Sequence, residues 1–97
     1  MAKGYWIVHV EVADPVGYKQ YVALNAKAFA KYGARFLVRG GQSVLKSGSL
    51  RPRHVVIEFD SYEAALACYE SPEYREAMAV RDKYAKADLV VVEGWAG

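Results

Sequence analysis

The stretch YWIVHVEVADP at residues 5–15 predicts how the fold begins. Residues 5–12 are rich in β-branched and aromatic side chains, with polar residues at alternate late positions, which is typical of a strand. Asp14 can then accept hydrogen bonds from the free N–H groups of a helix, and Pro15 suits the first helical position. The sequence therefore predicts a strand that is followed directly by a helix.

The rest of the chain continues this alternation of strands and helices. An apolar stripe at helical spacing extends the first helix to Gly33, which can adopt the left-handed conformation that ends a helix. Capping signals at Asp60 with Glu63, and at Ser71 with the proline after it, split the second helical region in two. Further strands are expected at residues 35–39, 54–59 and 89–93, and a polar connection at residues 42–52.

This order of elements predicts the fold class. A β-α-β-β-α-β arrangement is typical of an α+β, ferredoxin-like fold, in which a four-stranded antiparallel sheet carries its helices on one face. The chain has 97 residues, so we expect one domain over residues 1–97.

Composition and charge narrow the classes of partner. Hydrophobic residues make up 54% of the chain, which is more than one small core needs, so a partner surface is expected. The net charge of +2 is too small to imply a polyanion. No run approaches the roughly 18 apolar residues of a membrane span, and the N-terminus does not resemble a signal peptide. With Cys68 as the single cysteine, we expect a cytoplasmic protein without a disulfide.

The alternation of side chains along a strand sorts the sheet into two faces. One face is expected to be wholly apolar and to lie under the helices. Its predicted members are Trp6, Val8, Val10, Val12, Phe36, Val38, Val55, Ile57, Phe59, Val90 and Val92. The other face mixes apolar and ionisable groups: Tyr5, Ile7, His9, Glu11, Arg35, Leu37, Arg39, His54, Val56, Glu58, Leu89, Val91, Glu93 and Trp95.

A mixed face of this kind predicts a homodimer. A contiguous apolar patch that faces water usually marks an interface, and two such sheets packed face to face would bury both patches. The expected assembly is a dimeric α+β barrel.

The polar members of the mixed face are the candidate site. The first and third strands are expected to be neighbours, so His9 and Glu58 could approach each other, and a carboxylate can orient a histidine ring as an acid or base. Arg39, with His54, could hold a small molecule, since a guanidinium binds a carboxylate by two parallel hydrogen bonds. Two alternatives stay open: these groups neutralise one another across the dimer, or they are solvated and have no role.

Other motifs are missing from the sequence. It contains no Gly-x-Gly-x-x-Gly and no phosphate-binding loop, so no cofactor is expected. No ligand spacing typical of a metal site occurs, so no metal is expected. Residues 54–59, HVVIEF, lack the basic and aromatic signature of an RNA-binding strand, which argues against a nucleic-acid partner.

Six blocks of the sequence resemble one protein family. They are KGYWI at 3–7, KYG at 31–33, FLVRGG at 36–41, VIEF at 56–59, YESPEY at 69–74 and VEG at 92–94. In this order they are similar to the domain of unknown function 1330 family. The resemblance implies a ferredoxin-like, dimeric α+β barrel protein of the bacterial cytoplasm, with no established reaction, cofactor or catalytic residues.

The resemblance also marks particular positions. It places Arg39, Glu58, Ser71 and Tyr74 among the family's signature positions. The chain differs from the family's pattern at Cys68, where a tryptophan is common, and at residue 60, where a proline is common.

These observations leave three functions open. The first is a cofactor-independent enzyme that acts on a small anionic molecule in a cavity by the sheet face, with His9 and Glu58 as catalytic residues and Arg39 and His54 binding the ligand. The second is a dimer that binds a small ligand without transforming it. The third is a structural or interaction protein whose barrel interior is filled by side chains.

Overall fold

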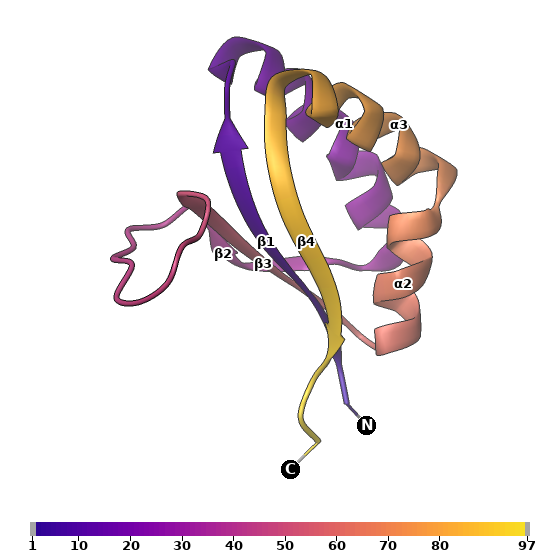
Figure 1. Cartoon of the computed structure of the whole chain (residues 1–97). Helices are drawn as coiled ribbons and strands as arrows, with labels where there is room; N and C mark the ends of the chain where they lie inside the picture. The colour runs from indigo at the N-terminus through magenta and orange to yellow at the C-terminus, as the bar shows by residue number, and fades with distance from the viewer. Residues whose placement is uncertain (1, 97) are drawn as a thin grey trace.

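The computed structural model of the chain describes residues 2–96. It contains a four-stranded antiparallel sheet with three helices on one of its faces, which confirms the predicted ferredoxin-like α+β fold (Figure 1). In chain order the elements are β1 (Gly4–Val12), α1 (Pro15–Tyr32), β2 (Arg35–Arg39), β3 (Arg53–Phe59), α2 (Tyr62–Glu70), α3 (Pro72–Tyr84) and β4 (Ala85–Glu93).

The strands are ordered β2-β3-β1-β4, so β1 and β3 form the centre of the sheet as expected. We call the face that the helices do not cover the open face. The connection between β2 and β3 projects from the sheet on the side away from the helices (Figure 1). Within residues 2–96, no helix combines the length and the apolar character needed to cross a membrane.

Most of the predicted helix ends are confirmed. Asp14 Oδ1 accepts hydrogen bonds from the N–H groups of Val16 and Gly17, and the chain leaves α1 through Gly33 at a φ of 67°. Ser71 Oγ caps α3 by accepting from the Tyr74 N–H group.

The predicted cap of α2 is wrong. Ser61, not Asp60, accepts the hydrogen bond from the Ala64 N–H group, because α2 begins one residue later than the capping box implies. Asp60 instead binds the guanidinium of Arg35.

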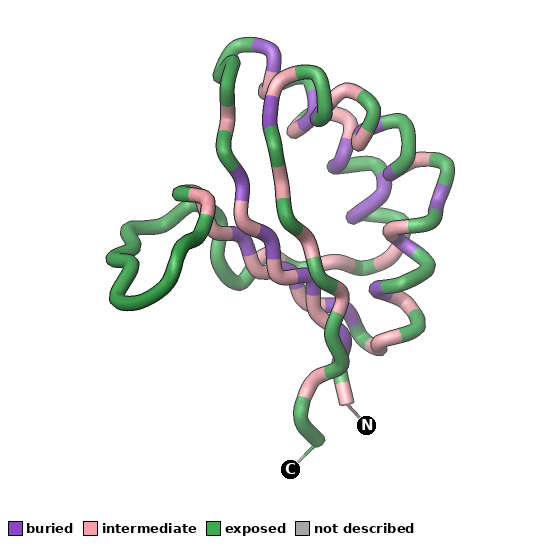
Figure 2. The backbone as a smooth tube through the Cα atoms, in the orientation of Figure 1, coloured by how far each residue is buried: buried purple, intermediate pink, exposed green. Residues whose placement is uncertain are grey.

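The core lies between the helices and the sheet, with Trp6 at its centre. Its indole packs edge-on against Phe29, Tyr69 and Tyr74, and its Nε1 donates to the Ala65 carbonyl at 2.9 Å. The purple, buried positions alternate along β1 and β3 (Figure 2). The predicted assignment of faces is therefore confirmed for these two strands.

For β4 the predicted assignment is wrong. The strand pairs with β1 so that Val91 lies opposite Trp6 and Leu89 opposite Val8, and directly opposed residues share a face. Leu89 and Val91 pack against the core, while Val90 and Val92 are exposed on the open face.

Candidate functional site

A β-bulge in β2 decides where Arg39 lies. The register shifts between Phe36 and Val38, so that Val38 lies opposite Val56 and Arg39 lies opposite Val55. Since Val55 is buried beneath the helices, Arg39 emerges on the helix-covered side, with its Cζ 4.2 Å from the centre of the Phe36 ring. The predicted placement of Arg39 on the open face beside His9 is therefore wrong, and so is the placement of Val38 under the helices.

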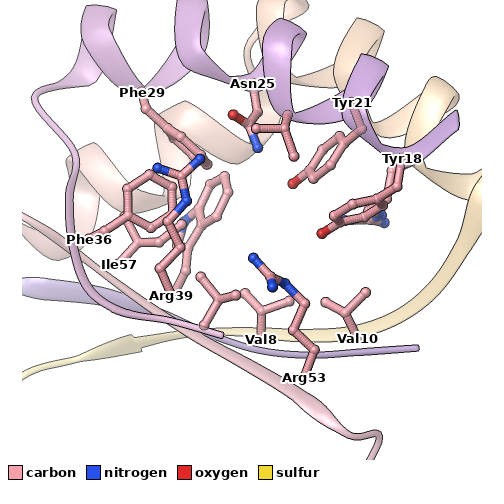
Figure 3. A pocket seen from close by; sticks show the side chains of 14 residues that line it. Val8, Val10, Tyr18, Tyr21, Asn25, Phe29, Phe36, Arg39, Arg53 and Ile57 are labelled. Atoms are coloured by element: carbon pink, nitrogen blue, oxygen red, sulfur yellow. The ribbon is translucent and has the colours of Figure 1, made fainter. Parts of the chain in front are cut away.

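Arg39 lines a pocket between the sheet and helices α1 and α3 (Figure 3). The space measures about 430 Å³ when its opening to solvent is included, but its enclosed cavity is only about 30 Å³. The apolar walls are formed by Trp6, Val8, Val10, Val22, Phe29, Phe36, Val55 and Ile57. The polar lining residues are Tyr18, Tyr21, Asn25, Arg39, Arg53 and Arg81.

Three of these polar residues are arginines, and among the lining residues there is no aspartate, glutamate or histidine. Arg39 and Arg53 form no ion pair with a carboxylate anywhere within residues 2–96. The Nε of Arg53 is buried without a hydrogen-bond partner in the same range. Positive charge that is withdrawn from water without a counter-charge is unfavourable, so the pocket is electrostatically suited to an anion.

Asn25 adds a neutral polar group at the helix side of the pocket. Asn25 is only 6% exposed as a residue, and its side-chain amide forms no hydrogen bond with another residue in the described range 2–96. Figure 3 shows the polar end of Asn25 directed toward the space between the helix and the sheet. The amide is therefore available to a molecule in the pocket.

Burial keeps the hydroxyls of Tyr18, in the pocket, and of Tyr74, in the core behind it, protonated at neutral pH. Burial, followed by the neighbouring Tyr21, raises the pKa of Tyr18, although Arg53 acts in the opposite direction. Burial also raises the pKa of Tyr74 far above its usual value. The Tyr18 hydroxyl, which lines the pocket, is therefore a hydrogen-bond donor toward an anion.

On the open face, the structure does not bring the predicted pair His9 and Glu58 together. His9 lies opposite His54, with the two Nδ1 atoms 2.8 Å apart, whereas Glu58 lies opposite Tyr5. Glu58 accepts hydrogen bonds from Arg35 Nε at 3.0 Å and from Tyr5 Oη at 3.2 Å. Four positions along a strand separate His9 from Tyr5, which corresponds to roughly 13 Å.

The side chain of Arg35 favours the ionised form of the Glu58 carboxyl. The hydrogen bond from this guanidinium, together with that from Tyr5, holds the pKa of the Glu58 carboxyl below its usual value, although burial acts in the opposite direction. Glu58 is therefore an ionised partner of Arg35.

A second, shallow depression lies at one end of the open face and measures about 1060 Å³ when its opening to solvent is included. His9 lines it together with Arg51, whose guanidinium binds Glu11 at 3.1 Å and Asp88 at 3.0 Å. Arg51, Glu11 and Asp88 of this depression are thus paired within the chain, unlike Arg39 and Arg53 of the pocket under α1.

The comparisons with known proteins agree with the fold. Residues 3–95 match the family described as "Domain of unknown function (DUF1330)". The chain belongs to this family. Among curated proteins, none matches the sequence.

Solved structures similar to this DUF1330 chain share its fold. A Rhodopseudomonas palustris protein of unknown function has a TM-score of 0.72 at 18% identity, over 99% of this chain and 85% of its own. A dimeric ferredoxin-like protein of unknown function from Thermobifida fusca has a TM-score of 0.60 at 21% identity, over 95% and 89%. SnoaB, a cofactor-independent oxygenase from Streptomyces nogalater, has a TM-score of 0.65 at 11% identity, over 100% and 97%.

Proposed function

We propose that this DUF1330 protein is an enzyme that acts on a small organic anion without a resident cofactor, in the pocket between the sheet, α1 and α3. The observation that carries the proposal is the lining itself, in which three arginines occur without a carboxylate. An anion would supply a counter-charge for Arg39 and Arg53, whereas Arg81 already pairs with Asp82 at 3.2 Å. A guanidinium binds carboxylates and similar oxyanions with strong, charge-assisted hydrogen bonds.

The mixture of apolar and polar side chains around the pocket supports a ligand with a ring or a similar flat body. Aromatic and branched side chains make up most of the lining, while Asn25 and Tyr21 of α1 present polar groups to the same space. Ligand pockets commonly combine a mostly apolar surface with a few convergent polar groups that fix orientation. The flexible side chain of Arg39 can move to admit such a ligand, because it is exposed at the edge of the sheet.

The assignment to an enzyme rests on analogy with a neighbour of the same fold. SnoaB is described as a cofactor-independent oxygenase. A second candidate function is binding without turnover. It is favoured by the absence of histidine, aspartate, glutamate and lysine among the lining residues, since these are the usual groups that accept a proton from a substrate.

We also propose that the open face packs against a second copy of the chain. Its exposed apolar side chains include Leu37, Val38, Val90 and Val92, and Trp95 is 94% exposed beside it. The Thermobifida fusca neighbour is described as dimeric. His9, His54 and Glu58 would then belong to the subunit contact, and their predicted catalytic and binding roles become an alternative to the pocket. The expected location in a bacterial cytoplasm stays a prediction.

The anion site is tested by titrating the protein with benzoate and following NMR chemical shifts. We expect Arg53→Met and Arg39→Met each to weaken benzoate binding about 10-fold to 100-fold, because a hydrogen bond to a charged group contributes roughly 1.5–3 kcal/mol. Arg75→Met is the matched control, since Arg75 is exposed on α3 and donates to the Glu70 carbonyl.

Equal loss in all three variants, or benzoate shifts confined to the open face, would contradict the anion site. A separate assay decides between the enzyme and the binding protein. Incubation with a panel of aromatic and enolic acids, followed by mass spectrometry, should reveal a product for at least one of them if the protein is an enzyme. A His9→Ala variant that abolishes this turnover while anion binding persists would favour the open face as the catalytic site.

A further inference from the structure

Three buried side chains form a continuous hydrogen-bonded chain that ends in the pocket. Arg81 Nη1 lies 3.0 Å from Tyr74 Oη, and Tyr74 Oη lies 2.8 Å from Tyr21 Oη. Tyr74 is fully buried in the core, whereas Tyr21 and Arg81 line the pocket. The Tyr21 hydroxyl is directed toward the space between α1 and the sheet (Figure 3).

The chemistry of the three groups fixes the direction of this chain. A guanidinium can only donate, so the Tyr74 oxygen accepts from Arg81. If Tyr21 donated to Tyr74, the proton of the Tyr74 hydroxyl would need another acceptor, and within residues 2–96 the structure shows none. Because Tyr74 has no access to water, its proton is satisfied only if it donates to Tyr21. The proton of Tyr21 is then free to point into the pocket.

Arg81, at the opposite end of this hydrogen-bonded series from Tyr21, is positively charged. Burial disfavours the charged form of Arg81, but Tyr74, Tyr21 and Asp82 outweigh it and raise the pKa of the guanidinium. Hydrogen bonds in series polarise one another in a medium of low dielectric constant. A guanidinium that donates to Tyr74 therefore makes Tyr74, and in turn Tyr21, a stronger donor.

Asn25 places a second donor beside the first. It lies four residues after Tyr21 on α1, so the two side chains share one face of the helix, and its amide forms no hydrogen bond within the described residues. Tyr21 and Asn25 both line the pocket, and two neutral donors that act on one oxygen can stabilise an oxyanion. The arginines at the sheet edge suit a carboxylate, whereas this inner end suits a single charged oxygen.

We propose that Tyr21 donates a hydrogen bond to a phenolate or enolate oxygen of the ligand, and that Tyr74 and Arg81 are positioning residues that fix the direction of this donor. The inference rests on the proposed anion pocket and adds the class of ligand to it. Tyr21 would be a binding residue that stabilises negative charge on oxygen, and no proton transfer from it is required.

The test uses 4-nitrophenol, because its ionised and neutral forms absorb at different wavelengths. At a fixed pH and saturating protein, we expect the bound probe to be more ionised than the free probe. Tyr21→Phe should weaken binding of the phenolate about 10-fold or more. It should leave binding of the neutral phenol within about 3-fold, because the apolar contacts remain. Tyr74→Phe should have an intermediate effect on the phenolate, and Tyr32→Phe, at the distant end of α1, should have none.

The relative binding of phenolate and neutral phenol tests the role of the Tyr21 hydroxyl. If Tyr21→Phe weakens the phenolate and the neutral phenol equally, Tyr21 only fills space and the inference is wrong, even if benzoate binding still depends on Arg53. If the wild-type protein binds neither 4-nitrophenol nor benzoate, the anion pocket itself is wrong and the inference is overturned with it. Should Tyr74→Phe fail to fold, the ratio measured with Tyr21→Phe still decides the role of the hydroxyl.

Discussion

The two faces of the sheet both carry arginines, but only one face neutralises them. On the open face, Arg35 lies between Glu58 and Asp60, and Arg51 lies between Glu11 and Asp88. On the helix-covered face, the lining of the pocket holds three arginines and no acidic residue. The arginines of the open face are therefore paired with carboxylates, while Arg39 and Arg53 lack such partners within residues 2–96.

The difference in charge pairing indicates on which face of the sheet a ligand would bind. Exposed ion pairs contribute only about 0–1 kcal/mol each, so the open-face arginines are explained by local neutralisation and solubility. Arg39 and Arg53 have no carboxylate partner within residues 2–96, and the Nε of Arg53 is buried without a hydrogen bond, whereas Arg81 of α3 pairs with Asp82 at 3.2 Å. An anion in the pocket would offset the desolvation of Arg53, and this asymmetry supports the proposal of a ligand site under α1.

The largest expected effect is on the proposed dimer, in which the open face packs against a second copy. Val90→Glu introduces a charge at a site that is 53% exposed in the single chain and that would be buried against a second copy. Since an unpaired buried charge costs several kcal/mol, we expect the dissociation constant of the dimer to rise at least about 100-fold. Sedimentation velocity over a range of concentrations measures it. Leu66→Glu, on the outer surface of α2, is the control, and a dimer that survives Val90→Glu would place the subunit contact elsewhere.

A second substitution, Asn25→Asp, removes the difference in charge pairing between the two faces. Asn25→Asp gives the pocket a carboxylate of its own at nearly constant volume, so the arginines acquire an internal partner. We expect benzoate affinity to fall about 10-fold to 100-fold, because a like charge now faces the ligand. Isothermal titration calorimetry measures the loss, and Gln42→Glu, in the exposed connection after β2, is the control of equal charge. Unchanged affinity in Asn25→Asp would mean that benzoate binds outside the pocket.

The smallest effect concerns the paired charges of the open face. Arg35→Met should lower Tm at pH 7 by at most a few degrees, because the ion pairs that it removes are exposed. In the folded chain, the pKa of Glu58 is held below the ordinary 4.5, chiefly by the hydrogen bond from Arg35. A lowered folded-state pKa gives stability that is present above the ordinary value and is lost as the pH falls through the folded-state value.

The difference in Tm between the wild-type protein and Arg35→Met should therefore shrink as the pH falls below 4.5. Differential scanning calorimetry at a series of pH values measures the trend, with Lys46→Met as a control in the exposed connection. A difference that grows in acid would show that Arg35 stabilises the fold by packing and not through Glu58.

The sequence predicted the backbone of the fold well because the relevant signals are local. The alternation in β1 and β3, the Asp14 cap and the Gly33 end of α1 each depend on a few neighbouring residues, and all are confirmed. The two failures of strand parity arise differently: a bulge shifts Arg39 in β2, whereas β4 pairs regularly with β1 in a register that places Val91 opposite Trp6. Parity depends on the pairing partner, and the register of Val90 and of Arg39 is set by strands that are distant in the sequence.

The candidate site was less predictable for the same reason. Asn25, Arg39, Arg53 and Arg81 come from four different elements, and nothing in their spacing along the chain indicates that they meet. One signal was present: Asn25 is a polar residue inside the buried stripe of the first helix, four positions after Tyr21. The pairing of His9 with His54 instead of Glu58 depends on the β1–β3 register, which alternation alone does not give.

The bulge in β2 has a consequence for comparing this chain with its relatives. An insertion or deletion of one residue at position 37 would exchange the two sides of everything after it in that strand. The arginine at the end of β2 would then belong either to the ligand site or to the subunit contact, with no change in its identity. A one-residue gap in an alignment of this edge strand therefore carries as much functional meaning as the loss of the arginine itself.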